Sequence, residues 1–271
     1  MKVTANYHGH TYRCGHAYGQ DEEYVQAALE MGFEVMGFAD HVILPGFSQY
    51  PMRADYDKLP DYLSSIDALK KKYEGKIEIF KGFEAEWLGA FYEDYYRDLL
   101  KSGKVDYLIL GQHGEMPRQG EFFFFPGSQK PKEAILRYAD LIVEGARTGL
   151  FSCICHPDVF VNWFHYYGEE GAIAARKIAE VAKEMNIPLE VNISCTRMQG
   201  FAFENENLPF YPFPSFWDIV SEVGCDVIIG VDAHQPSHYD SPYYQVFVDF
   251  AKKHRLNLLN RLPFRRPGID F

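Results

Sequence analysis

Nine side chains of this sequence are candidate ligands of transition-metal ions. Seven are histidines, one is a glutamate and one is an aspartate. Neutral imidazole and carboxylate are donors that zinc, manganese and iron accept, whereas no pair of cysteines has the spacing of a thiolate site. A zinc ion takes four ligands, so nine converging donors would hold two or three divalent ions. The candidate ligands are His8, His10, His16, His41, Glu84, His113, His156, Asp232 and His234.

The elements that must position these donors alternate along the chain. Short runs rich in β-forming residues recur, and each is followed by a helical stretch, which is typical of βα units and a parallel sheet. No internal repeat or low-complexity segment interrupts this pattern. Seven strands are expected, over Lys2–Tyr7, Glu34–Ala39, Ile77–Phe83, Val105–Leu110, Ser152–Cys155, Leu189–Ile193 and Asp226–Gly230.

Helices are expected between these strands. The stretch Asp21–Met31 opens with acidic residues, which favour a helix N-terminus, and Lys132–Arg147 repeats apolar residues at helical spacing. The stretches 112–129 and 196–214 are rich in aromatic, glycine and proline residues, and we expect them to be loops that contribute to a site. Further helices are expected over Tyr56–Tyr73, Tyr92–Lys101, Glu169–Met185, Phe216–Val223 and Tyr244–His254.

All of the candidate ligands except His16 stand just past the C-terminal end of a predicted strand. In a closed parallel barrel these strand ends meet on one face, which is the face that carries active sites. His8 and His10 are two residues apart, as are Asp232 and His234. Residues at this spacing in an extended chain point to the same side, so each pair is placed to chelate one ion.

Some of the polar residues near the strand ends have other interpretations. A single histidine after a strand is more often a hydrogen-bonded polar residue than a metal ligand. The ligand interpretation is favoured here because several histidines stand in such positions. Glu86 competes with Glu84 for the ligand role, and Asp40 either orients a neighbouring histidine or is an ordinary strand-end acid. Of the remaining histidines, His165 and His254 are expected on the surface or in packing, and His238 is a weaker site candidate.

Composition narrows the classes of protein to which the chain can belong. Its 271 residues, 47% of them hydrophobic, suffice for a substantial core and predict a single domain over residues 1–271. The formal charge of −11 opposes binding to nucleic acid. No run approaches the ~20 apolar residues of a membrane span, and the N-terminus lacks a signal peptide. The five scattered cysteines are expected to be reduced thiols, and a cytoplasmic location is expected.

Seven short motifs resemble, in order and spacing, those of the PHP (polymerase and histidinol phosphatase) family over about the whole chain. The length and the motif details are similar to the stand-alone histidinol-phosphatase branch, in particular at residues 14–17, at Glu190-Val191-Asn192 and at Arg197. The motifs are His8-Gly9-His10-Thr11, Cys14-Gly15-His16-Ala17, Ala39-Asp40-His41, Gly82-Phe83-Glu84, Gly111-Gln112-His113, Cys155-His156-Pro157-Asp158 and Asp232-Ala233-His234.

This resemblance implies a fold and a division of the ligands. The implied fold is a distorted (β/α)7 TIM-like barrel with its metal site at the C-terminal ends of the strands, in agreement with the seven strands predicted above. Three ions would be bound, and Glu84 would bridge two of them. The family pattern implies His8, His10, Glu84 and Asp232 for the first ion, Glu84, His113 and His156 for the second, and His16, His41 and His234 for the third.

The resemblance also implies an activity. A phosphate monoester is already negatively charged, so its hydrolysis needs charge neutralisation and a strong nucleophile at neutral pH, both of which clustered divalent ions supply. We expect a metal-dependent phosphomonoesterase in which a hydroxide bridging two ions attacks phosphorus, with Glu84, Asp232 and His234 in the catalytic centre. The leading substrate is L-histidinol phosphate, an intermediate of histidine biosynthesis. The alternatives are a nucleotide, sugar or phosphotyrosine phosphate and, less favoured, a metal-binding module without activity.

Four further residues are candidate contacts of a small phosphorylated substrate. Arg197 is expected to hold phosphoryl oxygens, because its planar guanidinium can bind two oxygens at once, and Arg53 is a weaker candidate. Glu115 is placed to meet a substrate ammonium group. Asp232, His238 or a bound water is expected to protonate the leaving group, and the sequence does not distinguish them.

Two features bear on the substrate and on self-association. Histidinol phosphatases tend to carry a basic residue near the position of Asn162-Trp163, and its absence here favours the alternative substrates. The run Phe122-Phe123-Phe124-Phe125 is too apolar for an ordinary exposed loop. It is expected either to cover the barrel mouth or to pack on a second copy of the chain in a homo-oligomer.

Overall fold

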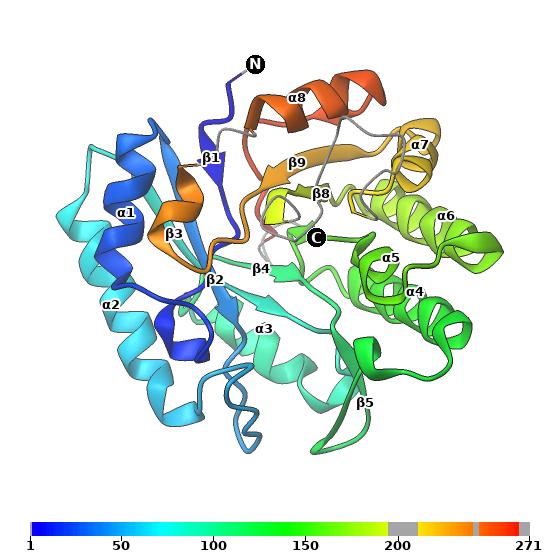
Figure 1. The fold of residues 1–271 in the computed structure, drawn as a ribbon. Coiled ribbons are helices and arrows are strands. Elements are labelled where there is room, and N and C mark those ends of the chain that lie inside the picture. The colour runs from blue at the N-terminus through cyan, green and yellow to red at the C-terminus, as the bar shows by residue number, and fades with distance from the viewer. Residues whose placement is uncertain (1, 195–210, 241–243, 266–271) are drawn as a thin grey trace.

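A curled parallel sheet stands at the centre of the computed structural model, which describes residues 2–194, 211–240 and 244–265. Eight strands form this sheet in the order β1-β2-β3-β4-β7-β8-β9-β10, with helices around its outside (Figure 1). The strands are β1 (Ala5–Asn6), β2 (Val35–His41), β3 (Glu78–Ala85), β4 (Tyr107–Leu110), β7 (Cys153–Ile154), β8 (Leu189–Asn192), β9 (Asp226–Gly230) and β10 (Asn257–Leu258). All seven predicted strands are present, and β10 is additional.

The predicted helices are also present, with small shifts at their ends. The first begins with a reciprocal capping box between Gln20 and Glu23, and the helix before β8 ends at Asn186 in the left-handed conformation. Only α5 has no counterpart among the predictions. The helices are α1 (Asp21–Glu30), α2 (Leu59–Lys72), α3 (Glu93–Lys101), α4 (Pro131–Arg147), α5 (Val159–Phe164), α6 (Gly168–Met185), α7 (Pro214–Val223) and α8 (Tyr244–Lys253).

Short 3-10 turns connect several of these elements. One of them forms the start of the helix that was predicted over residues 56–73, so that α2 begins three residues later than expected. The turns are η1 (Tyr12–Cys14), η2 (Tyr56–Lys58), η3 (Gly89–Phe91), η4 (Phe125–Gly127) and η6 (Pro236–Tyr239).

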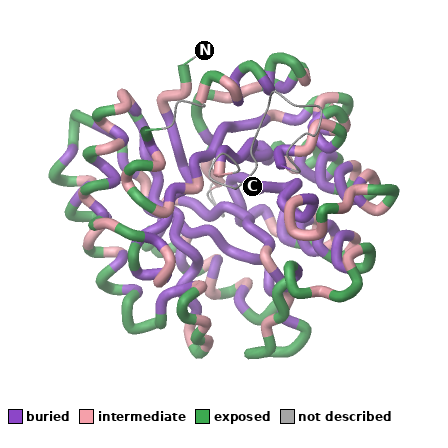
Figure 2. The backbone as a smooth tube through the Cα atoms, in the orientation of Figure 1, coloured by how far each residue is buried: buried purple, intermediate pink, exposed green. Residues whose placement is uncertain are grey.

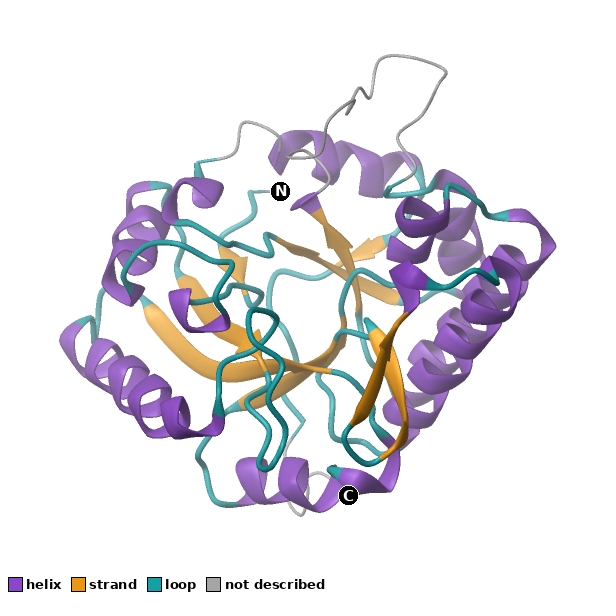
Figure 3. Cartoon of the chain, turned by 60° about the horizontal axis from the view of Figure 1, so that its bottom comes forward, coloured by secondary structure: helices purple, strands orange, loops and turns teal. Residues whose placement is uncertain are grey.

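The sheet closes on itself at the C-terminal ends of its strands. The amide of His10 donates to the carbonyl of Ala233 at 2.7 Å, and the amide of Ala233 donates to the carbonyl of His8 at 3.2 Å. These bonds join the segment after β1 to the segment after β9. At the opposite end β10 pairs with the first residues of β9. The fold is therefore the expected distorted barrel, with the ends of its strands brought to one face (Figure 3).

Residues alternate along each strand between two hydrophobic clusters. In β4, Tyr107 and Ile109 belong to a cluster inside the barrel, whereas Leu108 and Leu110 pack with residues of the surrounding helices. The hydroxyl of Tyr107 donates to the carbonyl of Tyr7 at 2.6 Å and so crosses the barrel interior. The backbone is buried along the strands and exposed on the outer turns of the helices (Figure 2). This packed interior supports the strand ends from below.

The stretch after β4 differs from the predicted loop. It contains an antiparallel hairpin of β5 (Gly114–Arg118) and β6 (Glu121–Phe124), which pair with each other and not with the barrel. The turn between them contains Gly120 at φ +85°. The alternation that identifies a strand is absent from β6, because three of its four residues are aromatic, and the hairpin was therefore missed.

Two further observations concern expectations about the whole chain. No helix in the described residues has the length and apolar character needed to cross a membrane. Cys14, Cys153, Cys155 and Cys225 are buried thiols without a disulfide. The fifth cysteine, Cys195, lies outside the described residues.

Candidate metal centre

The predicted metal ligands converge at the closed end of the barrel. Eight of the nine contribute to overlapping groups whose donor atoms lie within 4.8 Å of one another. The ninth, His16, lies at their edge, with its ring centroid 4.9 Å from that of His234. The groups built from predicted ligands contain His8, Glu84 and His156 together with Cys155; His8, His10 and Asp232; His10, His41 and His234; and His41, Glu84 and His113.

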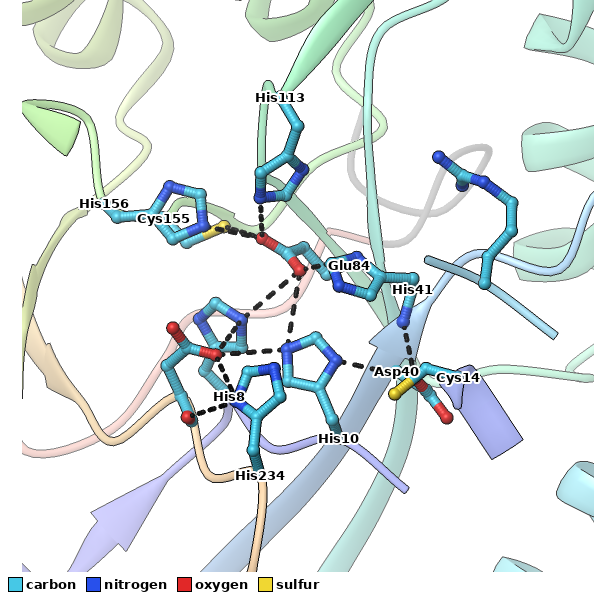
Figure 4. A network of polar contacts seen from close by, with 12 residues as sticks. His8, His10, Cys14, Asp40, His41, Glu84, His113, Cys155, His156 and His234 are labelled. Atoms are coloured by element: carbon cyan, nitrogen blue, oxygen red, sulfur yellow. Dashed lines mark hydrogen bonds and ion pairs between the residues drawn. The ribbon is translucent and has the colours of Figure 1, made fainter. Parts of the chain in front are cut away.

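Glu84 lies in the middle of this cluster, and its two carboxylate oxygens face different histidines (Figure 4). The side chain is 1% exposed. Such an arrangement matches a carboxylate that bridges two ions. Oε1 lies 2.7 Å from Nε2 of His156 and 3.5 Å from Nε2 of His113, whereas Oε2 lies 3.0 Å from Nδ1 of His41 and 3.6 Å from Nε2 of both His8 and His10.

The chemistry of these donors suits a divalent cation. The Nε2 atom of His8 is buried and has no hydrogen-bond partner among the described residues. It lies 3.5 Å from Oδ1 of Asp232, and Nε2 of His10 lies 3.1 Å from the same oxygen. Imidazole nitrogens that face carboxylate oxygens in a buried space are the donor set of zinc, manganese and iron sites. The residues therefore fit the metal ions that the sequence predicts.

The structure places His41 differently from the division implied by the family resemblance. Its ring centroid lies 4.4 Å from that of His10, which joins it to the group with His234. Its Nδ1 also lies 3.0 Å from Glu84, which joins it to the group with His113. His41 thus stands between the implied second and third sites. His16 and His234 lie together, as the resemblance implied.

Charge within the cluster acts differently on its members. Burial opposes the effect, but the facing carboxylates raise the pKa of His8, His10 and His113, so a metal ion that binds these rings displaces a proton. Glu84, His41 and His234 are already held in the forms that bind metals. Burial by itself would raise the pKa of Glu84, but the imidazoles of His113, His8 and His41 hold it well below its usual range. Burial, together with the charge of His10, lowers the pKa of His41 to about 4 and that of His234 to about 3. Ionised carboxylates and neutral imidazoles are the states in which these groups act as ligands.

Three carboxylates outside the predicted ligand set orient three of the histidines. Each lies next to the Nδ1 atom of one ring, which leaves Nε2 directed at the cluster and fixes the tautomer. Nδ1 of His8 lies 3.0 Å from Glu190, Nδ1 of His10 lies 3.4 Å from Asp40, and Nδ1 of His113 lies 3.1 Å from Glu86. Glu86 therefore supports a ligand and does not replace Glu84.

Sequence reasoning gave Glu190 no role, although a signal for it was present. Every other predicted strand ends at a candidate ligand, and only the strand at 189–193 lacks one. That strand instead carries the carboxylate that orients His8 and accepts a bond from the backbone amide of His156 at 3.1 Å. The absence of a candidate ligand after this one strand therefore indicated that the strand has a different role in the site.

Two glycines at strand ends leave room for the central carboxylates. A Cβ atom at Gly111 would lie 2.0 Å from Oε1 of Glu84, and one at Gly230 would lie 1.7 Å from Oε1 of Glu190. Neither position can carry a side chain without moving a carboxylate. Gln112 follows Gly111, and its side chain pairs with both the amide and the carbonyl of Trp87 at 2.9 and 3.2 Å. This clamp ties the end of β4 to the end of β3.

Two of the predicted substrate contacts form ion pairs with other side chains of the protein. Arg53 is fully buried, and its guanidinium is occupied by Glu86 at 3.0 Å and by the carbonyl of Val42 at 3.0 Å, so it cannot reach a bound phosphate. Glu115 pairs with Arg137 at 2.9 Å, on the side of the β5–β6 hairpin that lines a hollow of about 670 Å³ with α4. The carboxylate of Glu115 therefore faces Arg137 and this hollow.

The other two predicted substrate contacts stay predictions. His238 lies next to the cluster, because its Nδ1 accepts the backbone amide of His234 at 3.0 Å. Arg197 lies outside the described residues.

The phenylalanines at 122–125 differ in exposure. Phe125 is buried, whereas Phe123 and Phe124 are exposed. Phe122 packs near Phe47, with ring centroids 6.3 Å apart.

Known proteins resemble this chain in sequence and in fold. The chain is 28% identical over 232 residues to a "Probable histidinol-phosphatase" of Deinococcus radiodurans, covering 84% of this chain and 85% of that protein. A histidinol-phosphatase of Bacillus subtilis is 31% identical over 98 residues, which are 32% of this chain and 35% of that protein.

A solved structure shares the architecture. The histidinol phosphate phosphatase of Lactococcus lactis, complexed with zinc, L-histidinol and phosphate, aligns with a TM-score of 0.70. The alignment covers 96% of this chain and 99% of that protein at 17% identity, so it establishes the fold. The PHP domain matches residues 6–194. With this match and the donor cluster at the strand ends, the chain belongs to the PHP domain family and is a phosphatase-like hydrolase of that family.

Proposed function

We propose that this chain binds two or three divalent ions, of Zn, Mn or Fe, and hydrolyses a small phosphate monoester, with L-histidinol phosphate as the leading substrate. The observation that carries the proposal is the set of overlapping donor groups around Glu84. Four ligands saturate one zinc ion, so donor groups that share residues correspond to adjacent ions. Adjacent ions are the arrangement that phosphoryl transfer uses.

The proposed ligands follow the division that the family resemblance implies, except that His41 is assigned between two ions. When bound, the ions would neutralise phosphoryl oxygens and acidify a water molecule at neutral pH. Glu84 is proposed to bridge the first and second ions, with His41 between the second and the third. The first ion would be held by His8, His10, Glu84 and Asp232, the second by Glu84, His113 and His156, and the third by His16 and His234.

Side chains of the protein carry the remaining steps of the proposal. Arg197 is proposed to grip the phosphoryl oxygens. Because Nδ1 of His238 accepts the amide of His234, a neutral His238 ring carries its proton on Nε2. His238 is therefore proposed as the proton donor to the leaving alkoxide in preference to Asp232, which stays ionised because His8 and His234 outweigh the effect of burial on its pKa.

The relatives support the choice of substrate. Two curated proteins that this chain resembles carry the name histidinol-phosphatase, and the Lactococcus lactis protein of the same fold was solved with L-histidinol and phosphate. All three proteins are distant relatives of this chain, with identities between 17% and 31%. The substrate must therefore be tested on this chain.

The test measures phosphate release by the purified, metal-analysed protein. The panel contains L-histidinol phosphate, phosphotyrosine, a nucleoside monophosphate, a sugar phosphate and p-nitrophenyl phosphate. We expect kcat/KM for L-histidinol phosphate to exceed every other value and to fall on chelation. Turnover of L-histidinol phosphate no faster than that of p-nitrophenyl phosphate would reject this substrate. Failure of the metal-loaded protein to release phosphate from any ester would reject the activity.

One contact favours a second candidate, a phosphatase of aryl esters such as phosphotyrosine. The ring centroid of Trp163 lies 6.4 Å from that of His113, at the position where a basic residue was expected. An indole beside a metal ligand can pack on a flat leaving group. Preference for phosphotyrosine in the same panel, reduced by Trp163→Leu, is the outcome that this candidate requires.

A further inference from the structure

Residues 49–53 make contacts at two places in the candidate metal centre, with His16 directly and with Glu86, which orients His113. This segment lies between β2 and η2. The carbonyl of Pro51 accepts a hydrogen bond from Nδ1 of His16 at 2.8 Å. Two residues later, the guanidinium of Arg53 binds Glu86, which in turn holds Nδ1 of His113 at 3.1 Å. One short piece of chain therefore reaches both His16 and His113.

Arg53 is bound on every side of its guanidinium. Nε donates to Oε1 of Gln49 at 2.8 Å, Nη1 donates to the carbonyl of Val42 at 3.0 Å, and Nη2 donates to Glu86 at 3.0 and 3.1 Å. The side chain is 0% exposed. A buried charge is tolerated only when it is paired and fully hydrogen-bonded, and Arg53 meets this condition. Arg53 therefore acts on the protein itself, through the residues that its guanidinium contacts.

Glu86 transmits the position of Arg53 to His113. The carboxylate is 1% exposed and lies between the guanidinium of Arg53, at 3.0 Å, and Nδ1 of His113, at 3.1 Å. Glu86 accepts the Nδ1 proton of His113, which directs Nε2 of that ring at Glu84, 3.5 Å away. Without Arg53, Glu86 would keep only His113 as a charged partner among these contacts.

The backbone of the segment fixes the distance between its two contacts. The amides of Met52 and Arg53 both donate to the carbonyl of Gln49, at 2.7 and 3.3 Å, and form a tight turn. The ring of Tyr50 also packs closely on Gly15, next to His16. Displacing Arg53 therefore moves Pro51, and with it the acceptor that orients His16.

We infer that residues 49–53 form a positioning element that couples the His113 and His16 metal groups, with Arg53 acting through Glu86 and the Pro51 carbonyl acting directly. The inference rests on the proposed metal-dependent function. It assigns Arg53 the role of a positioning residue in place of the substrate contact expected from sequence. A consequence is that loss of Arg53 weakens metal binding in both groups, although Arg53 contacts no ligand itself.

The experiment compares metal binding by wild-type protein, Arg53→Met and Arg53→Lys. Metal content is measured by mass spectrometry after dialysis, and Co²⁺ affinity is measured by absorption titration. We expect Arg53→Met to bind Co²⁺ about 10- to 100-fold more weakly at two sites, the size typical of losing a residue that orients a ligand. Arg53→Lys keeps the charge but cannot reproduce three separate contacts, so we expect partial recovery.

Arg13→Met is the matched control. Arg13 is also buried and pairs with Asp21 at 2.8 Å and Asp61 at 2.7 Å, neither of which holds a metal-ligand histidine. We expect it to lower the melting temperature without changing Co²⁺ stoichiometry. If Arg13→Met loses metal as Arg53→Met does, the effect is general destabilisation and the inference is wrong. If Arg53→Met does not fold, Arg53→Lys, which keeps the buried charge and leaves Glu86 in place, is titrated instead.

The outcomes separate this inference from the proposed function. A wild-type protein that binds two or three ions and releases phosphate, while Arg53→Met binds Co²⁺ unchanged at every site, overturns only the inference. Weakening confined to one site overturns the coupling. Wild-type protein that binds no ions contradicts the proposed function, whatever the variants do.

Discussion

Three buried carboxylates hold three imidazole rings of the metal centre by their Nδ1 atoms. Glu190 holds His8, Asp40 holds His10 and Glu86 holds His113. Each carboxylate comes from a strand other than that of its histidine, or from the end of such a strand. Orientation of a ligand ring by a neighbouring carboxylate raises its basicity and limits its motion, and so strengthens metal binding.

Glu190 provides the test at this scale. Glu190→Ala removes the acceptor of His8 Nδ1 and is expected to weaken metal binding by about 10- to 100-fold, whereas Glu190→Gln, whose amide oxygen can still accept, loses less. Competition with a chelator of known affinity measures the change. Glu180→Ala, on an exposed position of α6, is the matched control and should bind metal as the wild type does. Equal affinity in Glu190→Ala and wild type contradicts the role given to Glu190.

At the scale of elements, the parallel strands deliver the ligands and the connections decide what surrounds them. The ends of β2, β3 and β4 lie side by side, with His41 opposite Glu84 in the register of β2 and β3. The β5–β6 hairpin follows directly after His113 and stands apart from the barrel. Its three phenylalanines, and Phe125 at the start of η4, therefore differ in environment although they are adjacent in sequence.

This difference predicts unequal costs of substitution within the phenylalanine run 122–125. Phe125 is 4% exposed and packs edge-on against Tyr138, with ring centroids 6.0 Å apart, whereas Phe123 is 57% exposed. Phe125→Ala is expected to cost about 3 to 5 kcal/mol of unfolding free energy. Phe123→Ala is expected to change it by less than about 0.5 kcal/mol. Urea denaturation measures both, and similar losses would show that the hairpin packs differently from the arrangement described here.

For the molecule as a whole, the formal charge of −11 does not describe the site. Two or three divalent ions would add about four to six positive charges at the closed end of the barrel, and bound cations are commonly the largest local charges of a site. An acidic chain can therefore present a positive pocket to a phosphate ester. The same ions would link strands that are far apart in sequence.

Metal removal should therefore lower global stability. Ions that bind only the folded chain stabilise it by about 2.7 kcal/mol per site when the free ion is at 100 times its Kd. We expect a chelator to lower the melting temperature, and excess Zn²⁺ or Mn²⁺ to restore it. Differential scanning calorimetry of treated and reloaded protein measures the shift. His113→Ala should show a smaller metal-dependent shift, and an identical melting temperature with and without chelator contradicts the metal centre.

Much of the architecture was predictable because local patterns of residue type along the chain indicate strands and helices. β-forming runs that alternate with amphipathic stretches predicted the seven strands and their parallel arrangement. The β5–β6 hairpin and β10 were not predicted. β6 lacks alternation and β10 has only two residues, so neither carries a periodic signal of its own. Their existence depends on backbone hydrogen bonds made after the chain has folded.

By itself, the sequence determined which donors the chain carries and at which strand end each one stands, because parallel strands bring their C-terminal ends to one face whatever the details of packing. Only the tertiary structure decided which partner each charged side chain meets. Arg53 is taken by Glu86 and Glu115 by Arg137, and His41 stands between two groups. These pairings join residues from separate elements, so they depend on distances of a few ångströms that spacing along the chain does not encode.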